Sequence, residues 1–475
     1  MELKRRFPIL VIFGLLATFA AEAQQISIQL KPNPFYGELA ATPGPLTPAQ
    51  LIQASLIMSG ADPATLAADT RKLDAVVAEV QRSIGPIQDP YARGNAVLAF
   101  MFKHLLASYS FPQARMDVLL ATGTFNCVSS AVLYMILARS VGLTVEGVST
   151  PDHAFCTVSF GGKSVDVETT NPYGFDPGTK RQFRTAFGET GFVYVPPGDY
   201  ALRKNTNGRG LLSFILQDRI ALLERQGSFG EAVGLAADRY ALLGTKGSLD
   251  DLTNEIANFG AALNNAGEYA QGLALVESAT SLYGRSSAIE KLASDLVHNQ
   301  TLKLAGAGRY DSALSFIDAQ AAQGIVSAEA ARSLRSLVME RRLYHAVTTQ
   351  PFAEALAAVQ ASFRKSQISE STYRGYVVSL YGRRAQETAS SQGYLAAVKV
   401  IDEAIALVGS DQELLQARSI YMQNYVTTVH NRFAELYNAR SYSQARQVLQ
   451  DGLKVVPNNP LLTRDLTLLS GASGG

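Results

Sequence analysis

A cysteine at the expected start of a helix is the first residue of this chain that could do chemistry. Thr124 and Asn126 are residue types that cap helix N-termini, and Cys127 follows them directly. The apolar run 128–137 then predicts a largely buried helix. In its first turn, unpaired backbone N–H groups and the positive end of the helix dipole favour a thiolate over a thiol. We therefore expect Cys127 to be suited to act as a nucleophile.

A β-hairpin is predicted after this helix. Residues 153–160 and 163–170 alternate between apolar and polar side chains, and two glycines separate them. A Gly-Gly loop between alternating runs is typical of a two-residue hairpin turn. This turn pairs Cys156 with Val167 and, at the open end, His153 with Thr170. One face of the hairpin is then apolar and belongs to a core; it carries Cys156, Val158, Phe160, Val165 and Val167.

The other face of the hairpin carries polar groups that can act on a thiol. Glu168 is the diagonal neighbour of His153 and lies within side-chain reach of it, while Asp166 lies one step further along. With Cys127 these residues are the parts of an activated thiol: a nucleophile, a base, and a third group that fixes the imidazole tautomer. The third member is Glu168 or Asp166.

At these positions the chain resembles the transglutaminase-like cysteine hydrolases. In that family a Cys at a helix N-terminus is followed by a His on a strand and an Asp on the next strand, often before a Pro-Thr or similar pair. Cys127 and His153 match the first two positions, and the family's Asp falls on Glu168, one methylene longer, when the threonines after it are aligned. The resemblance covers roughly residues 90–200. It implies an α+β papain/transglutaminase-like domain, in which a helix with an N-terminal cysteine packs on antiparallel strands.

Other interpretations of these residues stay open. A free cysteine near an apolar helix is more often part of a core than a catalyst. Cys127 could also form a disulfide with Cys156, the only other cysteine of the 475 residues. The predicted hairpin opposes that pairing, because Cys156 points away from the face that carries His153. Asp166 and Glu168 could be ordinary solvated surface charges.

The N-terminal 23 residues have the pattern of a secretory signal peptide. A positive segment at residues 4–6 precedes an apolar segment at residues 7–19, and Ala21-Glu22-Ala23 forms a cleavage site with small residues. The apolar segment is short for a membrane span, so membrane attachment is expected only if it stays uncleaved. We expect an exported protein, periplasmic or secreted. Residues 24–48 are rich in proline and predict a linker.

Residues 49–205 are expected to form the transglutaminase-like domain. Helical periodicity, with Pro near each start, predicts helices within residues 47–60, 63–85 and 89–110, packed on the cysteine helix. The turn-rich stretch 169–178 is expected to form one wall of a cleft. A short strand is predicted after it, within residues 191–197.

Residues 206–475 are repetitive. An aromatic residue is followed three positions later by a small one, and this pair recurs at intervals of 40 to 48 residues: Phe229 and Ala232, Tyr269 and Gly272, Tyr310 and Ala313, Phe352 and Ala355, Tyr394 and Ala397, Tyr442 and Ala445. Each pair lies between two helical stretches, which predicts an all-α solenoid of helix–turn–helix repeats. The units resemble tetratricopeptide repeats, although the interval exceeds the usual length of about 34 residues. A generic helical bundle is the alternative.

Composition narrows the range of partners and cofactors. The formal net charge is +1, so nothing suggests a nucleic-acid partner. The five histidines and two cysteines show no spacing typical of a metal site, and we expect neither a metal nor another cofactor.

These features together predict an exported cysteine-dependent hydrolase or acyltransferase that acts on an amide or peptide bond. Cys127 attacks, His153 takes and returns a proton, and Glu168 or Asp166 orients the imidazole. The resemblance favours proteolysis or amide hydrolysis over cross-linking. The repeats would dock a protein or cell-envelope peptide substrate, or a protein partner. The alternative is a non-catalytic protein-binding scaffold that retains the transglutaminase-like fold; a weaker one is a helical adaptor with a disulfide-clipped insert.

Overall fold

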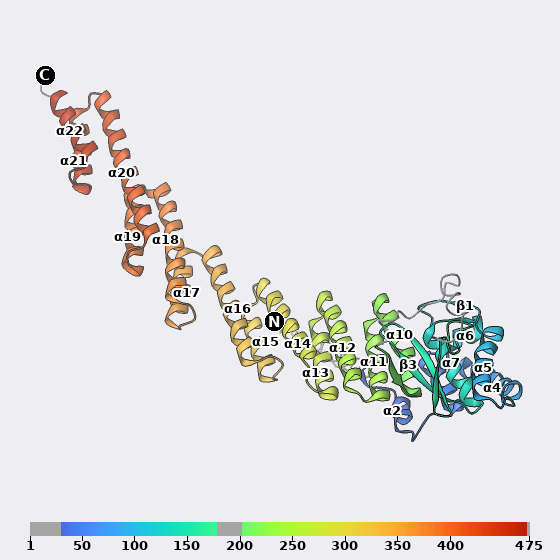
Figure 1. Cartoon of the computed structure of the whole chain (residues 1–475). Helices are drawn as coiled ribbons and strands as arrows, with labels where there is room; N and C mark the ends of the chain where they lie inside the picture. Colours follow the sequence, from blue (N-terminus) through green and yellow to red (C-terminus); the bar gives the residue numbers. More distant parts are fainter. Residues whose placement is uncertain (1–29, 178–201, 473–475) are drawn as a thin grey trace, which may run out of the picture. The chain divides into compact units, whose positions relative to one another are not determined.

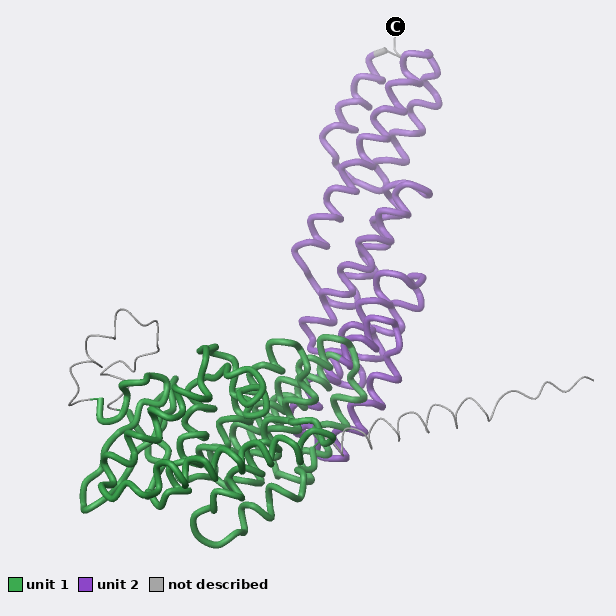
Figure 2. The backbone as a smooth tube through the Cα atoms, turned by 90° about the vertical axis from the view of Figure 1, so that its right-hand side faces the viewer, with its two compact units in different colours: residues 1–299 green, residues 300–475 purple. Residues whose placement is uncertain are grey.

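The computed structural model describes residues 30–177 and 202–472, and the chain divides into two units, Met1–Asn299 and Gln300–Gly475 (Figure 2). The predicted signal peptide and the short strand predicted within residues 191–197 lie outside the described residues. Among the helices that are described, none combines the length and the apolar character needed to cross a membrane.

Several helices precede the cysteine helix: α2 (Pro34–Ala41), α3 (Pro48–Met58), α4 (Pro63–Ser83), α5 (Pro90–His104) and α6 (Met116–Thr122). Helices α3, α4 and α5 confirm the three helices expected from periodicity. Each of these three begins with a proline behind a capping side chain, supplied by Thr47, Asp62 and Asp89. A proline in the first turn loses no intrahelical hydrogen bond, so it starts these helices rather than breaking them.

The stretch 24–48 is not the irregular linker that its prolines suggested, because it contains α2. Asn33 caps this helix and Pro34 occupies its first position. Tyr36 and Leu39 are buried, and α2 packs against α11 (Phe229–Leu243). The prolines were interpreted as breakers, whereas Pro34 stands where a proline begins a helix.

The cysteine helix α7 (Cys127–Ser140) lies against an antiparallel sheet whose described strands have the order β5-β4-β3-β6. Strands β4 (Ala154–Phe160) and β5 (Lys163–Val167) confirm the predicted hairpin, and β3 (Thr144–Ser149) pairs with β4. Strand β6 (Lys204–Thr206), which the sequence analysis missed, pairs with β3. Cys156 lies opposite Val167, as predicted. The ladder ends at Val167, so the predicted pair of His153 with Thr170 does not form.

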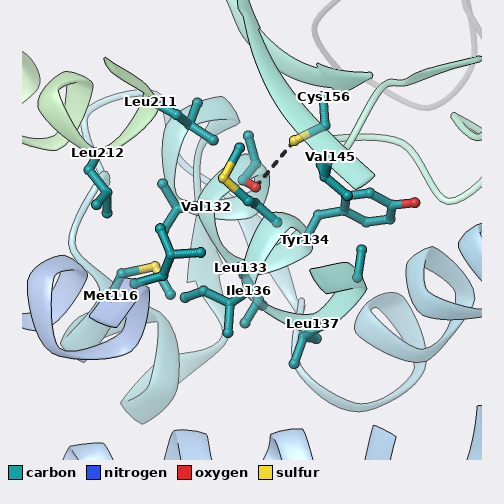
Figure 3. Close-up of a cluster of buried hydrophobic side chains, with 14 of the residues drawn as sticks. Met116, Val132, Leu133, Tyr134, Ile136, Leu137, Val145, Cys156, Leu211 and Leu212 are labelled. Carbon is teal, nitrogen blue, oxygen red and sulfur yellow. Dashed lines mark hydrogen bonds between the residues drawn. The ribbon is translucent and has the colours of Figure 1, made fainter. Parts of the chain in front are cut away.

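Helix α7 lies between the sheet and the helices α3–α6 (Figure 1). It is buried on all sides along residues 127–138, which explains why its sequence is almost continuously apolar. The apolar face of the hairpin packs on it, and Cys156 lies above its side chains (Figure 3). Leu211 and Leu212 of α10 (Gly208–Gln226) belong to the same core. The core therefore continues across residue 205, where a domain boundary was expected.

The remaining described chain is a succession of helices: α12 (Lys246–Ala266), α13 (Tyr269–Tyr283), α14 (Ser287–Gly306), α15 (Tyr310–Ala322), α16 (Ala328–Thr349), α17 (Phe352–Arg364), α18 (Glu370–Gln392), α19 (Tyr394–Val408), α20 (Gln412–Asn438), α21 (Tyr442–Val455) and α22 (Pro460–Ala472). Within each unit, neighbouring helices along the chain pack side by side (Figure 1). This arrangement is consistent with the predicted repeat solenoid.

The six aromatic residues that mark the repeats share one structural position. Each is the first residue of a helix, and the small residue three positions later is buried. At Gly272 a Cβ atom would come within 2.6 Å of the Leu296 side chain, so a larger residue here would force Leu296 to shift. The preceding helices, from α10 to α20, have 19 to 27 residues, which explains why the interval exceeds about 34 residues.

Candidate active site

Cys127 is the first residue of α7, and its neighbours fix the first turn. The Asn126 side chain accepts hydrogen bonds from the N–H groups of Val128 and Ser129, both at 3.0 Å. In return the Ser129 hydroxyl accepts from the Asn126 N–H at 2.9 Å, which completes a capping box. Among the described residues the Cys127 N–H itself has no hydrogen-bond partner. The predicted helix start is confirmed, and one amide at that start remains free to bind a ligand.

His153 and Glu168 meet at the open end of the hairpin. His153 precedes β4, Glu168 follows β5, and the ring nitrogen Nε2 lies 2.7 Å from the carboxylate oxygen Oε2. The two side chains are 1% and 8% exposed, so Glu168 is not a solvated surface charge. Its other oxygen accepts hydrogen bonds from the backbone N–H and the hydroxyl of Thr170, at 3.1 and 2.7 Å. Both carboxylate oxygens are therefore held in place.

The Cys127 side chain is the other polar group that acts on the imidazole, and its interaction with the ring raises the pKa of His153. Since Nε2 faces Glu168, Nδ1 is the nitrogen left to meet the sulfur. Nδ1 is buried and makes no hydrogen bond with any described residue. Burial alone would lower the pKa of His153, but the Glu168 carboxylate and the Cys127 side chain together raise it to about 10. The ring is therefore an imidazolium at neutral pH.

A hydrogen bond between two buried hydroxyls ties α7 to the segment that carries Glu168. Ser130, one turn after Cys127, lies 2.9 Å from the hydroxyl of Thr169, and both residues are fully buried. The distance between the cysteine and the carboxylate is thus fixed by a direct contact between their neighbours. The sequence analysis missed this contact; its only signal was the position of Thr169 directly after Glu168.

Asp166, the alternative third member, has different partners. Its carboxylate accepts hydrogen bonds from the Thr157 hydroxyl at 2.7 Å and from two guanidinium nitrogens of Arg203 at 2.7 and 2.8 Å. The sequence left two candidates for the third member. In the structure Glu168 contacts the imidazole of His153, whereas Asp166 pairs with Arg203.

Cys156 lies on the core face of the sheet, as predicted. Both cysteines are free, so the disulfide alternative is wrong. The Cys156 thiol donates a hydrogen bond to the Ala131 carbonyl oxygen at 3.3 Å (Figure 3). Complete burial raises the pKa of Cys156 well above its ordinary value.

A pocket of about 330 Å³ opens beside Cys127 and His153. Phe111 at its rim is 64% exposed, and the carboxylates of Asp152 and Asp218 line it. The stretch 169–178 was expected to form a wall, but its described part, residues 169–177, does not line this pocket. There the segment turns back along β5, where Phe175 forms an antiparallel bridge with Val167, and the fully buried Phe175 ring packs edge-on against Tyr91.

Residues 68–177 match a family model described as the transglutaminase-like superfamily. The matched range runs from within α4 to the loop after β5 and includes Cys127, His153 and Glu168. Comparison with curated proteins and with solved structures found no match. No group of three or more His, Cys, Asp or Glu side chains that could hold a metal ion occurs among the described residues. The chain therefore contains a transglutaminase-like domain at residues 68–177, followed by a long helical region consistent with a repeat solenoid.

Proposed function

We propose that this protein is an exported cysteine-dependent hydrolase or acyltransferase that acts on an amide or peptide bond through Cys127, His153 and Glu168. The observation that carries the proposal is the buried imidazole held by Glu168 at 2.7 Å, with its other ring nitrogen unpaired and with Cys127, at a helix N-terminus, lining the same pocket. Burying an imidazolium and a carboxylate costs stability unless other contacts compensate. A non-catalytic scaffold gains nothing from that cost, which favours the enzyme.

In the acylation step the Cys127 thiolate attacks the carbonyl carbon of the substrate. A C–S bond forms, and the carbonyl π electrons move to oxygen. When this tetrahedral intermediate collapses, the C=O bond re-forms, the C–N bond breaks, and the leaving amine takes a proton from the His153 imidazolium. The products are a thioester on Cys127, a free amine and a neutral imidazole.

In the second step His153 acts as a base. The neutral imidazole takes a proton from water or from an acceptor amine as that group attacks the thioester carbonyl. Collapse of this second intermediate expels the Cys127 thiolate and restores the ion pair with the imidazolium. Attack by water gives hydrolysis, and attack by an amine gives acyl transfer. Glu168 holds the ring and stabilises its charged form throughout.

The helical repeats are proposed to dock the protein or cell-envelope peptide substrate, or a protein partner. Solenoids present extended surfaces formed by successive repeats, which supports this assignment. Export rests on the signal-peptide pattern of residues 1–23. N-terminal sequencing of the protein recovered from the periplasm or the medium tests export, and we expect the mature chain to begin at Gln24. A mature chain that begins at Met1 and stays in the cytoplasm would contradict it.

Trapping the acyl-enzyme tests the proposed chemistry. After brief exposure to p-nitrophenyl acetate and an acid quench, peptide mass spectrometry should find acetyl on Cys127 of the wild type. The label should fall at least about tenfold in His153→Gln, because the ion pair is lost. Wild-type protein that stays unlabelled on Cys127, or a His153→Gln variant labelled as fast as the wild type, would rule out the proposal.

A further inference from the structure

The pocket beside Cys127 carries negative charge that the proposed chemistry does not use. Asp152 and Asp218 line it, and none of the described residues that line it is a lysine or an arginine. His153 also lines the pocket, but its positive charge is offset by the Glu168 carboxylate at 2.7 Å. A substrate that lies on Cys127 therefore meets an excess of negative charge.

The side chain of Asn126 holds an acidic and an aromatic residue at this pocket. Its amide nitrogen Nδ2 donates to the Asp218 carboxylate oxygen Oδ2 at 2.8 Å and to the Phe111 carbonyl oxygen at 3.0 Å. All three residues line the pocket, and Asn126 directly precedes Cys127 in the chain. Direct hydrogen bonds therefore fix Asp218 and Phe111 against the residue before the proposed nucleophile.

Asp218 is half-buried and has one carboxylate oxygen left to bind a ligand. Oδ2 accepts the hydrogen bond from Asn126, and no described residue forms a hydrogen bond with Oδ1. Burial raises the pKa of Asp218, while the Asn126 amide and the charge of Arg225 lower it. Arg225 lies further along α10 and does not line the pocket. A carboxylate that has lost part of its hydration is stabilised when a cation approaches its free oxygen.

Other parts of the lining suit an aliphatic chain. Apolar surface comes from Phe111, Val128, Pro151 and Phe214, and the volume of about 330 Å³ is near the lower end of the range for ligand pockets. Lysine and arginine side chains combine an apolar stem with a charged end, and the faces of aromatic rings attract such cations. A neutral side chain would leave the carboxylates without a partner, and an acidic one would be repelled.

We propose that the substrate carries a cationic side chain, of the lysine or arginine type, on the acyl residue that becomes attached to Cys127, and that Asp218 pairs with its charge. This inference rests on the proposed function and names its substrate class. The acyl side is assigned because Asp218 is bound to the residue directly before Cys127, and the acyl group is bonded to the sulfur in the thioester. Asp152 is exposed, so solvent screens its charge and its contribution is smaller. The side-chain cation takes no part in the bond changes.

Competition between two acyl donors that differ only in charge tests this substrate class. The protein is exposed briefly to an equimolar mixture of the p-nitrophenyl esters of Nα-acetyllysine and Nα-acetylnorleucine and is quenched in acid. Peptide mass spectrometry then compares the two acyl groups on Cys127. Norleucine keeps the aliphatic stem of lysine and lacks the ammonium group. We expect the wild type to take the lysine acyl group at least about tenfold faster, the usual advantage of a hydrogen bond between charged groups.

Asp218→Asn removes the charge, and its amide oxygen can still accept the hydrogen bond from Asn126. In this variant the preference for lysine should fall to about threefold or less, while the rate with the norleucine ester stays within about twofold of wild type. Asp117→Asn is the matched control. Asp117 of α6 pairs with Arg115 at 2.6 Å and does not line the pocket, so the preference for lysine should be kept.

Four results would overturn the assignment. If wild-type Cys127 takes both acyl groups equally fast, the substrate class is wrong while the proposed function stands. If Asp218→Asn slows both esters equally, Asp218 acts through Asn126 on the helix start and does not bind the substrate. If neither amino-acid ester labels Cys127 but p-nitrophenyl acetate does, the pocket does not accept such an acyl group. If none of the three esters labels Cys127, the proposed function fails and this inference fails with it.

Discussion

The two cysteines of this chain lie on the same helix–sheet contact and have opposite environments. Cys127, at the N-terminus of α7, faces a pocket and an imidazolium. Cys156, on β4, is fully buried against the middle of α7 and donates its proton to a carbonyl oxygen. Residue type alone does not separate them. The two cysteines differ in three features that control thiol reactivity: position at a helix end, access from a pocket and a neighbouring positive charge.

This contrast is the basis for the different reactivities that we propose for the two thiols. A thiolate at Cys156 would lose the hydrogen bond to Ala131 and lie in apolar surroundings, and burial raises its pKa accordingly. Cys127 lines the same pocket as His153, and Glu168 raises the pKa of His153 and so favours its charged form. Cys156 therefore serves as an internal control for experiments on the proposed nucleophile.

The largest effect on activity is expected when the two cysteines are replaced in turn, because only one of them is proposed to react. Cys127→Ser should lower the rate of p-nitrophenyl acetate hydrolysis by at least about 10⁴, because a serine hydroxyl paired with this imidazolium is not ionised. Cys156→Ala should keep the rate within about twofold while it lowers stability by about 1–2 kcal/mol through a small cavity. Hydrolysis kinetics and urea unfolding measure the two effects. Similar loss of activity in both variants would contradict the assignment.

The second-largest effect on the acetylation rate is expected from replacement of Glu168, the carboxylate that favours the charged form of His153. Glu168→Gln keeps the side-chain length but removes the charge, so the imidazolium is less favoured and acetylation of Cys127 should fall by about 10²–10⁴. The matched variant Asp166→Asn removes a carboxylate bound to Thr157 and Arg203 and should change the rate only a few-fold. Equal losses in the two variants would show that the nearby negative charge matters and the contact with His153 does not.

Much of this site could be predicted because its signals are local. A capping residue before Cys127 and an apolar run after it define a helix start within a few residues. The Gly-Gly turn fixes the hairpin register, which correctly gave Cys156 opposite Val167 and brought His153 near Glu168. The alternative that Glu168 is a solvated surface charge was wrong; it stayed open because alternation along a strand does not show what covers each face.

The parts that were missed depend on contacts between distant segments. Strand β1 (Ser108–Tyr109) has only two residues, too few to give a pattern in the sequence, and its pairing with β2 (Thr124–Phe125) joins segments 16 positions apart. The hydrogen bond of Ser130 with Thr169 joins a helix to a loop across 39 positions. Helix α2 was missed because Pro34 was interpreted as a helix breaker. At the first position of a helix, which Pro34 occupies, a proline instead favours the helix start.

The charge of His153 should also appear in the pH dependence of stability. The pKa of His153 is raised to about 10 in the folded state and returns to about 6.5 on unfolding. The contribution of His153 to the free energy of unfolding is therefore fully present below pH 6.5. It is lost as the pH rises to about 10, by at most about 1.4 kcal/mol per pH unit. Urea unfolding of the wild type and of His153→Gln across this window measures the difference. Parallel curves for the two proteins would contradict a charged His153; Cys156→Ala serves as the control and should follow the wild type.

The smallest effect on the site is expected from the helical repeats. Ala397 of α19 is fully buried, and Ala397→Leu should overpack this helix contact and lower the stability of the Gln300–Gly475 unit by about 1–3 kcal/mol. Leu407→Ala, at a position 43% exposed on the same helix, should change stability by about 0.5 kcal/mol or less. The alkylation rate of Cys127 should stay at the wild-type value in both, and a large change would show that the site depends on the repeats.

The most direct test of a poised thiol is the pH dependence of iodoacetamide alkylation at both cysteines of the native protein, read by peptide mass spectrometry. We predict rapid alkylation of Cys127 at pH 6, no reaction of Cys156, and at least a tenfold slower reaction of Cys127 in His153→Gln. A wild-type Cys127 that does not react in the folded state, or that reacts equally fast without His153, would contradict the ion pair on which the proposed chemistry rests.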